Sequence, residues 1–165
     1  MLVKSSKKLA LSLFGNINKN KNIIEIINKD ILECYNDFNF NFPIKVFGNL
    51  PYNISTKILA KLLGPSNDKN KWEKLFLMFQ LEVANRIVAK PNTKQYGRLS
   101  LFSQFYSLPS LEFQIPKSSF FPIPKVESAL VRFQNNYKYY HKHDNALFRD
   151  IIKKSFQGRR KMIKN

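Results

Sequence analysis

The sequence is poor in the residues that build metal sites and disulfides. Its 165 residues include one cysteine, Cys34, and two histidines, His141 and His143. One cysteine cannot form an internal disulfide, and this set is too small for a thiolate zinc site. Both histidines lie in a polar stretch with the composition of a linker, so we expect them to be solvated rather than catalytic. The composition therefore predicts neither a disulfide framework nor a metal centre.

Glycine and long apolar runs are also scarce. The chain has five glycines, and no G-x-G-x-G or P-loop pattern occurs among them. The apolar run after Lys8 has about six residues, which is too short for a signal peptide. No apolar run reaches the length of a transmembrane helix. We therefore expect a soluble cytoplasmic protein.

Acidic residues are few beside the basic ones. The chain has 28 Lys and Arg against 11 Asp and Glu, which gives a formal net charge of +17. Such a charge attracts phosphate backbones or an anionic membrane face. The abundance of Lys and Asn is also expected of an AT-rich coding sequence. The charge alone therefore does not identify a partner.

Apolar residues make up 44 % of the chain, which suits one globular domain with a hydrophobic core. Helical spacing and branched apolar runs alternate along it, which predicts an α/β fold with a parallel sheet, with the later strands antiparallel at the edge. Strands are predicted over residues 22–30, 44–48, 72–80, 110–116 and 128–134, and helices over 2–14, 55–63, 81–90, 97–107 and from 147 onward.

The stretch "VFGNLPYNIST", Val46 to Thr56, places polar and aromatic groups directly after a predicted strand. Ligands bind at the carboxyl ends of such strands. Pro51 fixes its own φ and holds Leu50 extended, so the Leu50 carbonyl can face a ligand. The Asn49 side chain adds a second acceptor, and Tyr52 adds a flat ring. These groups are complementary to the exocyclic amine of a planar base, although the tetrapeptide can also occur by chance in a turn.

The exocyclic amine of a base is a poor nucleophile because its lone pair is delocalised into the ring. Two acceptors that hold both N–H bonds pull the nitrogen towards tetrahedral geometry and free the lone pair to attack an electrophile. This chemistry works by positioning and electrostatics, and it needs neither a metal nor a strong base.

Four ordered blocks resemble the ribosomal small-subunit RNA adenine dimethyltransferases, S-adenosylmethionine-dependent enzymes of the Rossmann-like class. The blocks are "VFGNLPYNIST", "FQLEVANRIVAKPNTKQYGRLSLFSQFY", "PKSSFFPIPKVESALVRF" and "FQGRRKMIKN". The resemblance runs from about Ile24 to Asn165, and "YGRLS" favours this family over the related erythromycin-resistance methyltransferases. It implies methylation of adjacent adenines near the 3′ end of small-subunit rRNA, within a pre-30S particle, by a monomer.

The resemblance also implies roles for single residues. Asn49 and the Leu50 carbonyl would hold the adenine amine in the Asn49–Tyr52 motif, and Tyr52 would stack on the base. Phe120, rather than Phe121, would close the other face of that base. Asp30 resembles the residue that accepts from the adenine of the cofactor, although an aspartate there also suits a helix N-cap. Candidates for RNA binding are Arg98, Lys117, Lys125, Arg159, Arg160 and Lys161, with a solvated charged face as the alternative.

The family's glycine-rich cofactor loop and the acidic residue that binds the ribose have no counterpart here. We therefore expect a fragment: residues 1–135 as a partial Rossmann-like domain that lacks its first strands, and 136–165 as a linker and the first helix of a small helical domain. The apolar face of that helix is expected to need partners beyond Asn165. We also expect weak stability and weak binding of S-adenosylmethionine. The alternatives are a non-catalytic nucleic-acid-binding module and an inactive remnant.

Overall fold

The computed structural model describes residues 2–3, 26–27, 29–35, 43–64, 72–136 and 145–156. The chain divides into two compact units, Met1–Asn39 and Phe40–Asn165, which are described separately. His141 and His143 lie outside the described residues. The described helices include none that is long and apolar enough to cross a membrane.

The first unit contains two short strands and one short helix. Strands β1 (Leu2–Val3) and β2 (Ile26–Ile27) pair in parallel, and helix α2 (Ile31–Cys34) follows. The prediction that Leu2 belongs to a helix is wrong, because it is paired with Ile26 in the β1–β2 ladder. The rest of that predicted helix lies outside the described residues.

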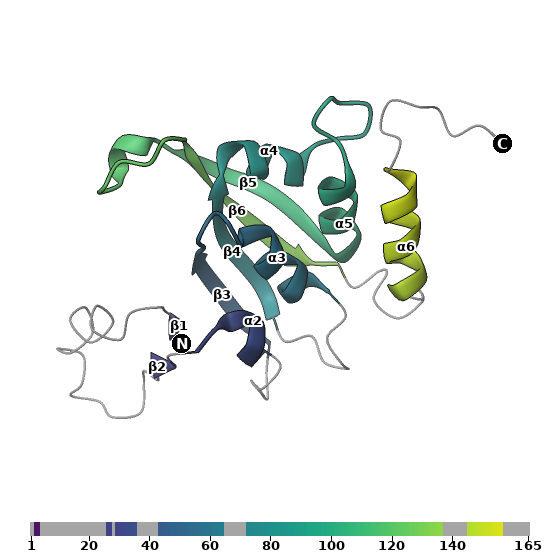
Figure 1. Ribbon diagram of the computed structural model, residues 1–165, viewed down its shortest axis with the longest axis horizontal. Helices are drawn as coiled ribbons and strands as arrows, with labels where there is room; N and C mark the ends of the chain where they lie inside the picture. The colour runs from purple at the N-terminus through teal and green to yellow at the C-terminus, as the bar shows by residue number, and fades with distance from the viewer. Residues whose placement is uncertain are drawn as a thin grey trace. The chain divides into compact units, whose positions relative to one another are not determined.

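The second unit is built on a four-stranded sheet of order β3-β4-β6-β5 (Figure 1). Its strands are β3 (Ile44–Asn49), β4 (Trp72–Gln80), β5 (Ser107–Ile115) and β6 (Ser128–Asn135). Strand β3 runs parallel to β4, whereas β6 is antiparallel to both β4 and β5. The predicted α/β class with later antiparallel strands is confirmed.

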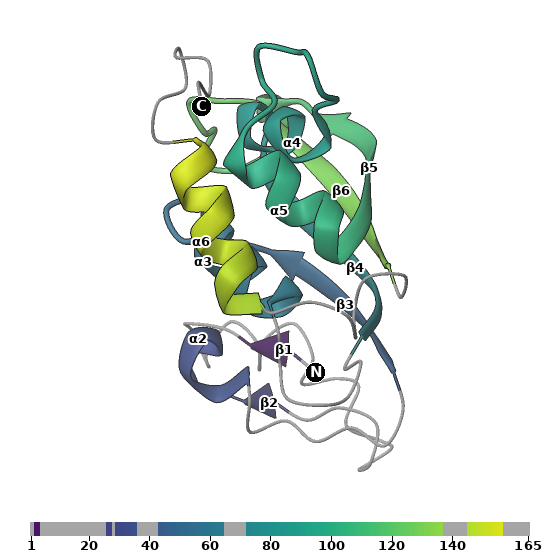
Figure 2. The ribbon, with the colours of Figure 1, turned by 90° about the vertical axis from the view of Figure 1, so that its right-hand side faces the viewer.

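The helices that follow the strands cover one face of this sheet. They are α3 (Ser55–Leu63), α4 (Leu81–Val88) and α5 (Arg98–Tyr106), seen on the same side in Figures 1 and 2. Leu75, Leu77 and Phe79 alternate along β4 and are fully buried. A strand has a period of two, so these residues share one face, the face that packs against the helices. Removing water from this apolar surface is the main source of stability for the unit.

Gly48 lies where β3, β4 and the following turn meet most closely. A Cβ atom built on it would lie 2.8 Å from Leu77 Cδ2 and 2.9 Å from Leu50 Cδ2. Both distances are shorter than carbon atoms tolerate, so a side chain here would displace one leucine or the other. The glycine therefore lets Leu50 pack directly beside the end of the central strand.

Helix α6 (Asn145–Ser155) packs against α5 in this unit. The Phe148 ring stacks on Phe105 with centroids 3.6 Å apart, and Ile152 is buried. Leu147 and Ile151 remain 57 % and 50 % exposed. The predicted apolar face of this helix is therefore only partly covered by the described residues.

Candidate active site

The Asn49–Tyr52 segment, called the motif turn below, directly follows the parallel ladder. Asn49 pairs with Met78 in the last register position of β3, so the Leu50 carbonyl lies beyond the ladder. The Asn49 residue is exposed, and its side chain has no hydrogen bond to any described residue. The Pro51 carbonyl accepts from the Ile54 amide at 3.2 Å, which closes the turn into α3. The structure therefore leaves the Asn49 amide open at the carboxyl edge of the sheet.

Tyr52 is fixed at two points. Its hydroxyl is 2.5 Å from the Ser128 hydroxyl at the start of β6, and Ser128 is fully buried. The Ser55 hydroxyl donates to the Tyr52 carbonyl at 3.0 Å from the first turn of α3. A ring held at its hydroxyl and at its backbone has little freedom to turn. Tyr52 therefore offers a fixed aromatic surface.

Residues 116–127, called the proline loop below, join β5 to β6 and project from the sheet (Figure 1). The loop begins with a short 3-10 helix, Lys117–Ser119. Glu127 closes its base, because its carboxylate accepts from the Lys117 amide at 2.9 Å. The Glu127 carbonyl accepts from the Leu81 amide at 2.9 Å, which ties this base to the start of α4. The loop is therefore anchored at its two ends.

The motif turn and the proline loop line one pocket, with a volume of about 250 Å³. The pocket is open to solvent and large enough for a planar base. It is lined by an amide side chain and a backbone carbonyl beside aromatic and proline rings. The lining residues are Asn49, Leu50, Pro51, Tyr52, Met78, Phe120, Phe121, Pro122 and Pro124.

The two adjacent phenylalanines of the loop differ in burial. Phe120 is half-buried, whereas Phe121 is 100 % exposed. Phe120 has extended backbone angles, φ −118° and ψ 149°. Both residues line the pocket, and Phe120 is the more buried of the two. Of the two rings, Phe120 is therefore the one suited to closing the pocket, and the prediction that it rather than Phe121 faces the base remains a prediction.

The other predicted residues are not among those that line this pocket. Asp30 caps α2 in the first unit, where its carboxylate accepts from the Leu32 amide at 2.8 Å. Arg98 is exposed at the first position of α5 and does not line the pocket. Lys117 and Lys125 are exposed on the proline loop. The candidates Arg159, Arg160 and Lys161 lie outside the described residues.

Sequence reasoning missed the residues that support the pocket from β4 and β6. Met78 lines it, Ser128 holds the Tyr52 hydroxyl, and Glu127 closes the loop. Tyr52 and Ser128 are 76 positions apart in the chain. Ser128 lies in the predicted strand 128–134 and in the block "PKSSFFPIPKVESALVRF", but neither signal gave its hydroxyl a partner.

Two shifts of pKa occur away from the pocket. Ser110, which donates to Glu112 at 2.7 Å, and Arg132, which pairs with Glu112 at 2.8 Å, lower the pKa of that carboxyl. Asp150, 2.7 Å from Lys154, raises the pKa of that ammonium group on α6. These pairs stabilise the surfaces of β5, β6 and α6 rather than the chemistry at the motif turn. The described residues contain no cluster of His, Cys, Asp or Glu able to hold a metal ion.

Several solved structures share this fold, among them these two. One is a dimethyladenosine transferase from Plasmodium falciparum, with a TM-score of 0.82 at 21 % identity over 98 % of this chain and 56 % of that chain. The other is the 23S rRNA methyltransferase ErmE, with a TM-score of 0.69 at 23 % identity over 94 % and 60 %. The chain therefore has the same Rossmann-like α/β fold as these two structures.

The family model for ribosomal RNA adenine dimethylase matches residues 2–165, so the chain belongs to that family. The resemblance seen in the four sequence blocks is thereby confirmed. Proteins called ribosomal RNA small subunit methyltransferase A are similar to it. The one from Cereibacter sphaeroides is 39 % identical over 142 residues, 86 % of this chain and 51 % of that protein. The one from Blochmanniella floridana is 42 % identical over 149 residues, 86 % and 53 %. The chain spans about half the length of these relatives.

Proposed function

We propose that the protein carrying this chain transfers methyl groups from S-adenosylmethionine to the N6 atoms of adjacent adenines near the 3′ end of small-subunit rRNA. The observation that supports this most is the pocket that joins the Asn49 amide, the Leu50 carbonyl and the rings of Tyr52 and Phe120. Family membership gives the reaction class, and the pocket has the acceptors and flat surfaces that an adenine requires.

In the proposed mechanism the target adenine lies between Tyr52 and Phe120. A base taken out of its stack loses a few kcal/mol, and two aromatic rings offset that loss at about 1–3 kcal/mol per stacked base. Before the first transfer, the Asn49 side-chain oxygen and the Leu50 carbonyl would accept the two N6–H bonds. This fixes the amine and turns its lone pair towards the incoming methyl group. Each transfer releases one of these protons past the oxygen that accepts it to water, so a single N6–H remains to be held for the second transfer. The acceptors are pre-positioned at the strand end, so the protein need not reorganise during transfer.

S-adenosylmethionine would supply an electrophilic methyl group on a sulfonium centre. The chain offers two residues towards it. Asp30 is exposed, and one of its carboxylate oxygens has no partner among the described residues, so it fits as an acceptor for an adenine amine. Asn49 lies at the edge of the sheet where this class of fold binds ligands.

The proposal is tested by incubating the protein with undermethylated small subunits and S-adenosylmethionine, then measuring N6,N6-dimethyladenosine by mass spectrometry. Asn49→Ala removes one of the two acceptors, and we expect the rate to fall by about 100-fold or more, the scale seen for other pre-positioned polar groups. Asn53→Ala is the matched control, because Asn53 is an exposed amide that does not line the pocket. Equal rates for the two variants would contradict the proposal.

A second function, binding of nucleic acid without transfer, is favoured by the net charge of +17. It predicts an affinity for RNA that falls steeply with salt while no methylated product forms. The same assay separates the two functions, because Asn49→Ala would leave that affinity unchanged.

The remaining assignments belong to the same proposal. We propose that residues 1–135 form the methyltransferase part and that 136–165, which include α6, begin a helical domain. The protein would act as a monomer in the cytoplasm, and its partner would be small-subunit rRNA within a pre-30S particle. Arg98, Lys117, Lys125 and the Arg159–Lys161 cluster would contact its phosphates.

A further inference from the structure

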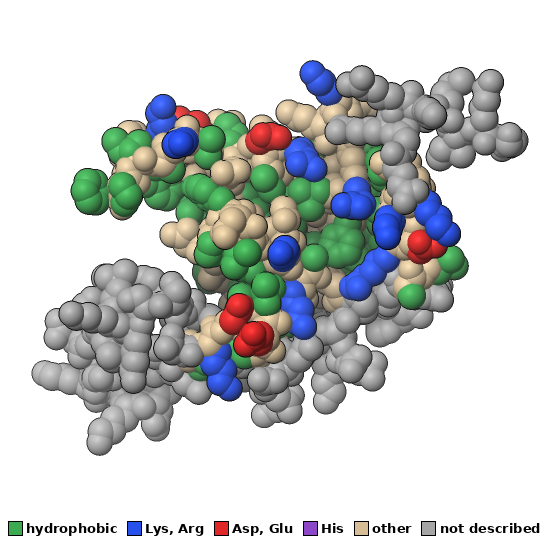
Figure 3. Space-filling model, in the orientation of Figure 1, with side chains coloured by type: hydrophobic (Ala, Val, Ile, Leu, Met, Phe, Trp, Pro, Cys, Tyr) green, Lys and Arg blue, Asp and Glu red, His purple; other side chains and the backbone are tan. Residues whose placement is uncertain are grey.

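The proline loop carries an aromatic ring for which the proposed chemistry has no use. Phe121 is 100 % exposed beside the half-buried Phe120. Two other apolar residues of the same loop, Ile123 and Val126, are 65 % and 41 % exposed. Phe121, Ile123 and Val126 are called the tip patch here, and apolar side chains gather at this end of the molecule in Figure 3. Exposed apolar groups that cluster mark a binding surface more often than isolated ones do.

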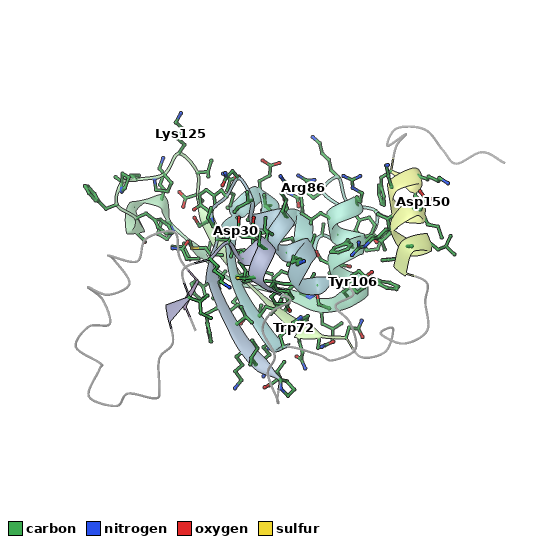
Figure 4. The ribbon with its side chains drawn as sticks, turned by 60° about the horizontal axis from the view of Figure 1, so that its bottom comes forward. Asp30, Trp72, Arg86, Tyr106, Lys125 and Asp150 are labelled. Atoms are coloured by element: carbon green, nitrogen blue, oxygen red, sulfur yellow. The ribbon has the colours of Figure 1, made fainter. Side chains whose placement is uncertain are left out.

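The charges around the tip patch indicate the kind of partner. Lys117 and Lys125 are exposed on the same loop, and Lys125 extends outward from it in Figure 4. Glu127 is the one acidic residue among positions 116–127, and its carboxylate is engaged by the Lys117 amide. An aromatic ring flanked by lysines is suited to unpaired RNA, where the base stacks on the ring and the cations meet the phosphates.

The position of the tip patch indicates which nucleotide it would meet. Phe120 and Phe121 are consecutive in the loop, and both contribute to the lining of the pocket. Phe120 is half-buried, whereas Phe121 is completely exposed. A strand of RNA that places one base beside Phe120 therefore brings the next nucleotide within reach of Phe121.

We propose that the tip patch binds the unpaired nucleotide adjacent to the target adenine, with Phe121 stacking on its base and Lys117 and Lys125 near its phosphates. This inference rests on the proposed function, because it takes the pocket as the site of the target base. In this arrangement Phe120 stacks on the base that reacts, and Phe121 stacks on the base of the adjacent nucleotide. Two adjacent substrate adenines would then be presented one after the other.

The test combines protein variants with RNAs that lack single bases. Affinities are measured by fluorescence anisotropy for a short single-stranded RNA with two adjacent adenines. They are also measured for versions in which the first adenine, the second adenine or either outer neighbour is abasic. Phe121→Ala is expected to weaken binding to the complete RNA by about 5- to 100-fold, as for loss of one stacked base. On the RNA that lacks the neighbouring base, the same substitution should cause no further loss.

Controls separate this inference from the proposed function. Phe121→Trp keeps an aromatic face and should retain affinity. Leu108→Ala removes an apolar side chain that is 55 % exposed at the far end of β5 and should change nothing. Thermal unfolding of each variant confirms that the fold is intact, as expected for side chains this exposed.

The outcomes can be told apart. If Phe121→Ala has no effect, or the same effect on every RNA, the tip patch does not bind the neighbouring base and the inference fails; a protein partner would then be the other candidate for this surface. The proposed function would still hold if Phe120→Ala weakens binding to the complete RNA but causes no further loss on the RNA that lacks the target adenine. If the effect of neither substitution depends on which base is missing, the pocket does not hold an adenine and both proposals fail.

Discussion

The motif turn and the proline loop line the same pocket but are held in different ways. The turn is fixed by residues of β6 and α3: the Tyr52 hydroxyl is hydrogen-bonded to buried Ser128, and the Tyr52 carbonyl accepts from Ser55. The loop is fixed at its base by Glu127, while its tip exposes Phe121 completely. Positioning an amine for attack requires geometry kept to fractions of an ångström. Stacking on bases tolerates more variation, so we expect the turn to govern rate and the loop to govern RNA affinity.

Among the contacts that hold the motif turn and the proline loop, the largest effect is expected at the one between Tyr52 and Ser128. Tyr52→Phe leaves the fully buried Ser128 hydroxyl without its partner. A buried polar group in that state costs about 1–3 kcal/mol in the free energy of unfolding. We expect a comparable loss in transfer rate, about 10-fold for each 1.4 kcal/mol, because the ring is no longer fixed. Urea unfolding and single-turnover methylation measure the two quantities.

Ser128→Ala is the matched control for that substitution. Tyr52 is half-buried whereas Ser128 is fully buried, so we expect Ser128→Ala to destabilise the protein less than Tyr52→Phe does. The double variant should lose less stability than the sum of the two single losses, since both remove one hydrogen bond. Strict additivity would show that the two hydroxyls do not interact.

A smaller effect is expected at the base of the loop. Glu127→Ala removes the acceptor for the Lys117 amide and should weaken RNA affinity a few-fold by loosening the loop. The free energy of unfolding should change by about 1 kcal/mol or less, as for one exposed hydrogen bond. Glu127→Gln keeps an acceptor oxygen and should restore most of the affinity. A loss of stability larger than the loss of affinity would mean that Glu127 supports the fold rather than the loop.

The smallest effect is expected for the single lysines of the loop. Lys117→Ala or Lys125→Ala should weaken RNA binding a few-fold at low salt and reduce the salt dependence by about one counterion each. Transfer at saturating RNA should be unchanged. Anisotropy titrations at several salt concentrations give the slope, and an unchanged slope would show that the lysine is only a solvated surface charge.

Local patterns were sufficient for much of this architecture. The predicted strands at 44–48, 72–80 and 128–134 correspond to β3, β4 and β6, because alternating or continuous apolar runs reflect burial directly. The strand predicted over 110–116 starts too far along the chain, since β5 begins at Ser107. There the chain passes from helix to strand without a break, and Pro109, a residue that argues against a strand interior, lies inside β5.

The pocket could be predicted only in part. The groups of the motif turn follow from the chemistry of Asn, Pro and Tyr after a strand. That residues 120–124 lie across from that turn depends on the β4–β6–β5 pairing, which no local pattern specifies. The contact between Tyr52 and Ser128 arises for the same reason. Nothing in the sequence around Ser128 distinguishes it from any other small polar residue at a strand start.

The central claim is that the pocket between the motif turn and the proline loop holds an adenine by its amine. Its most direct test is an NMR titration of the labelled protein with a short single-stranded RNA that contains two adjacent adenines. The account predicts that the side-chain amide of Asn49 and the rings of Tyr52 and Phe120 shift together. It also predicts that the side-chain amide signals of Asn53 do not shift and that an all-uridine RNA produces none of these shifts. Unchanged Asn49, Tyr52 and Phe120 signals while RNA binds elsewhere would contradict the account.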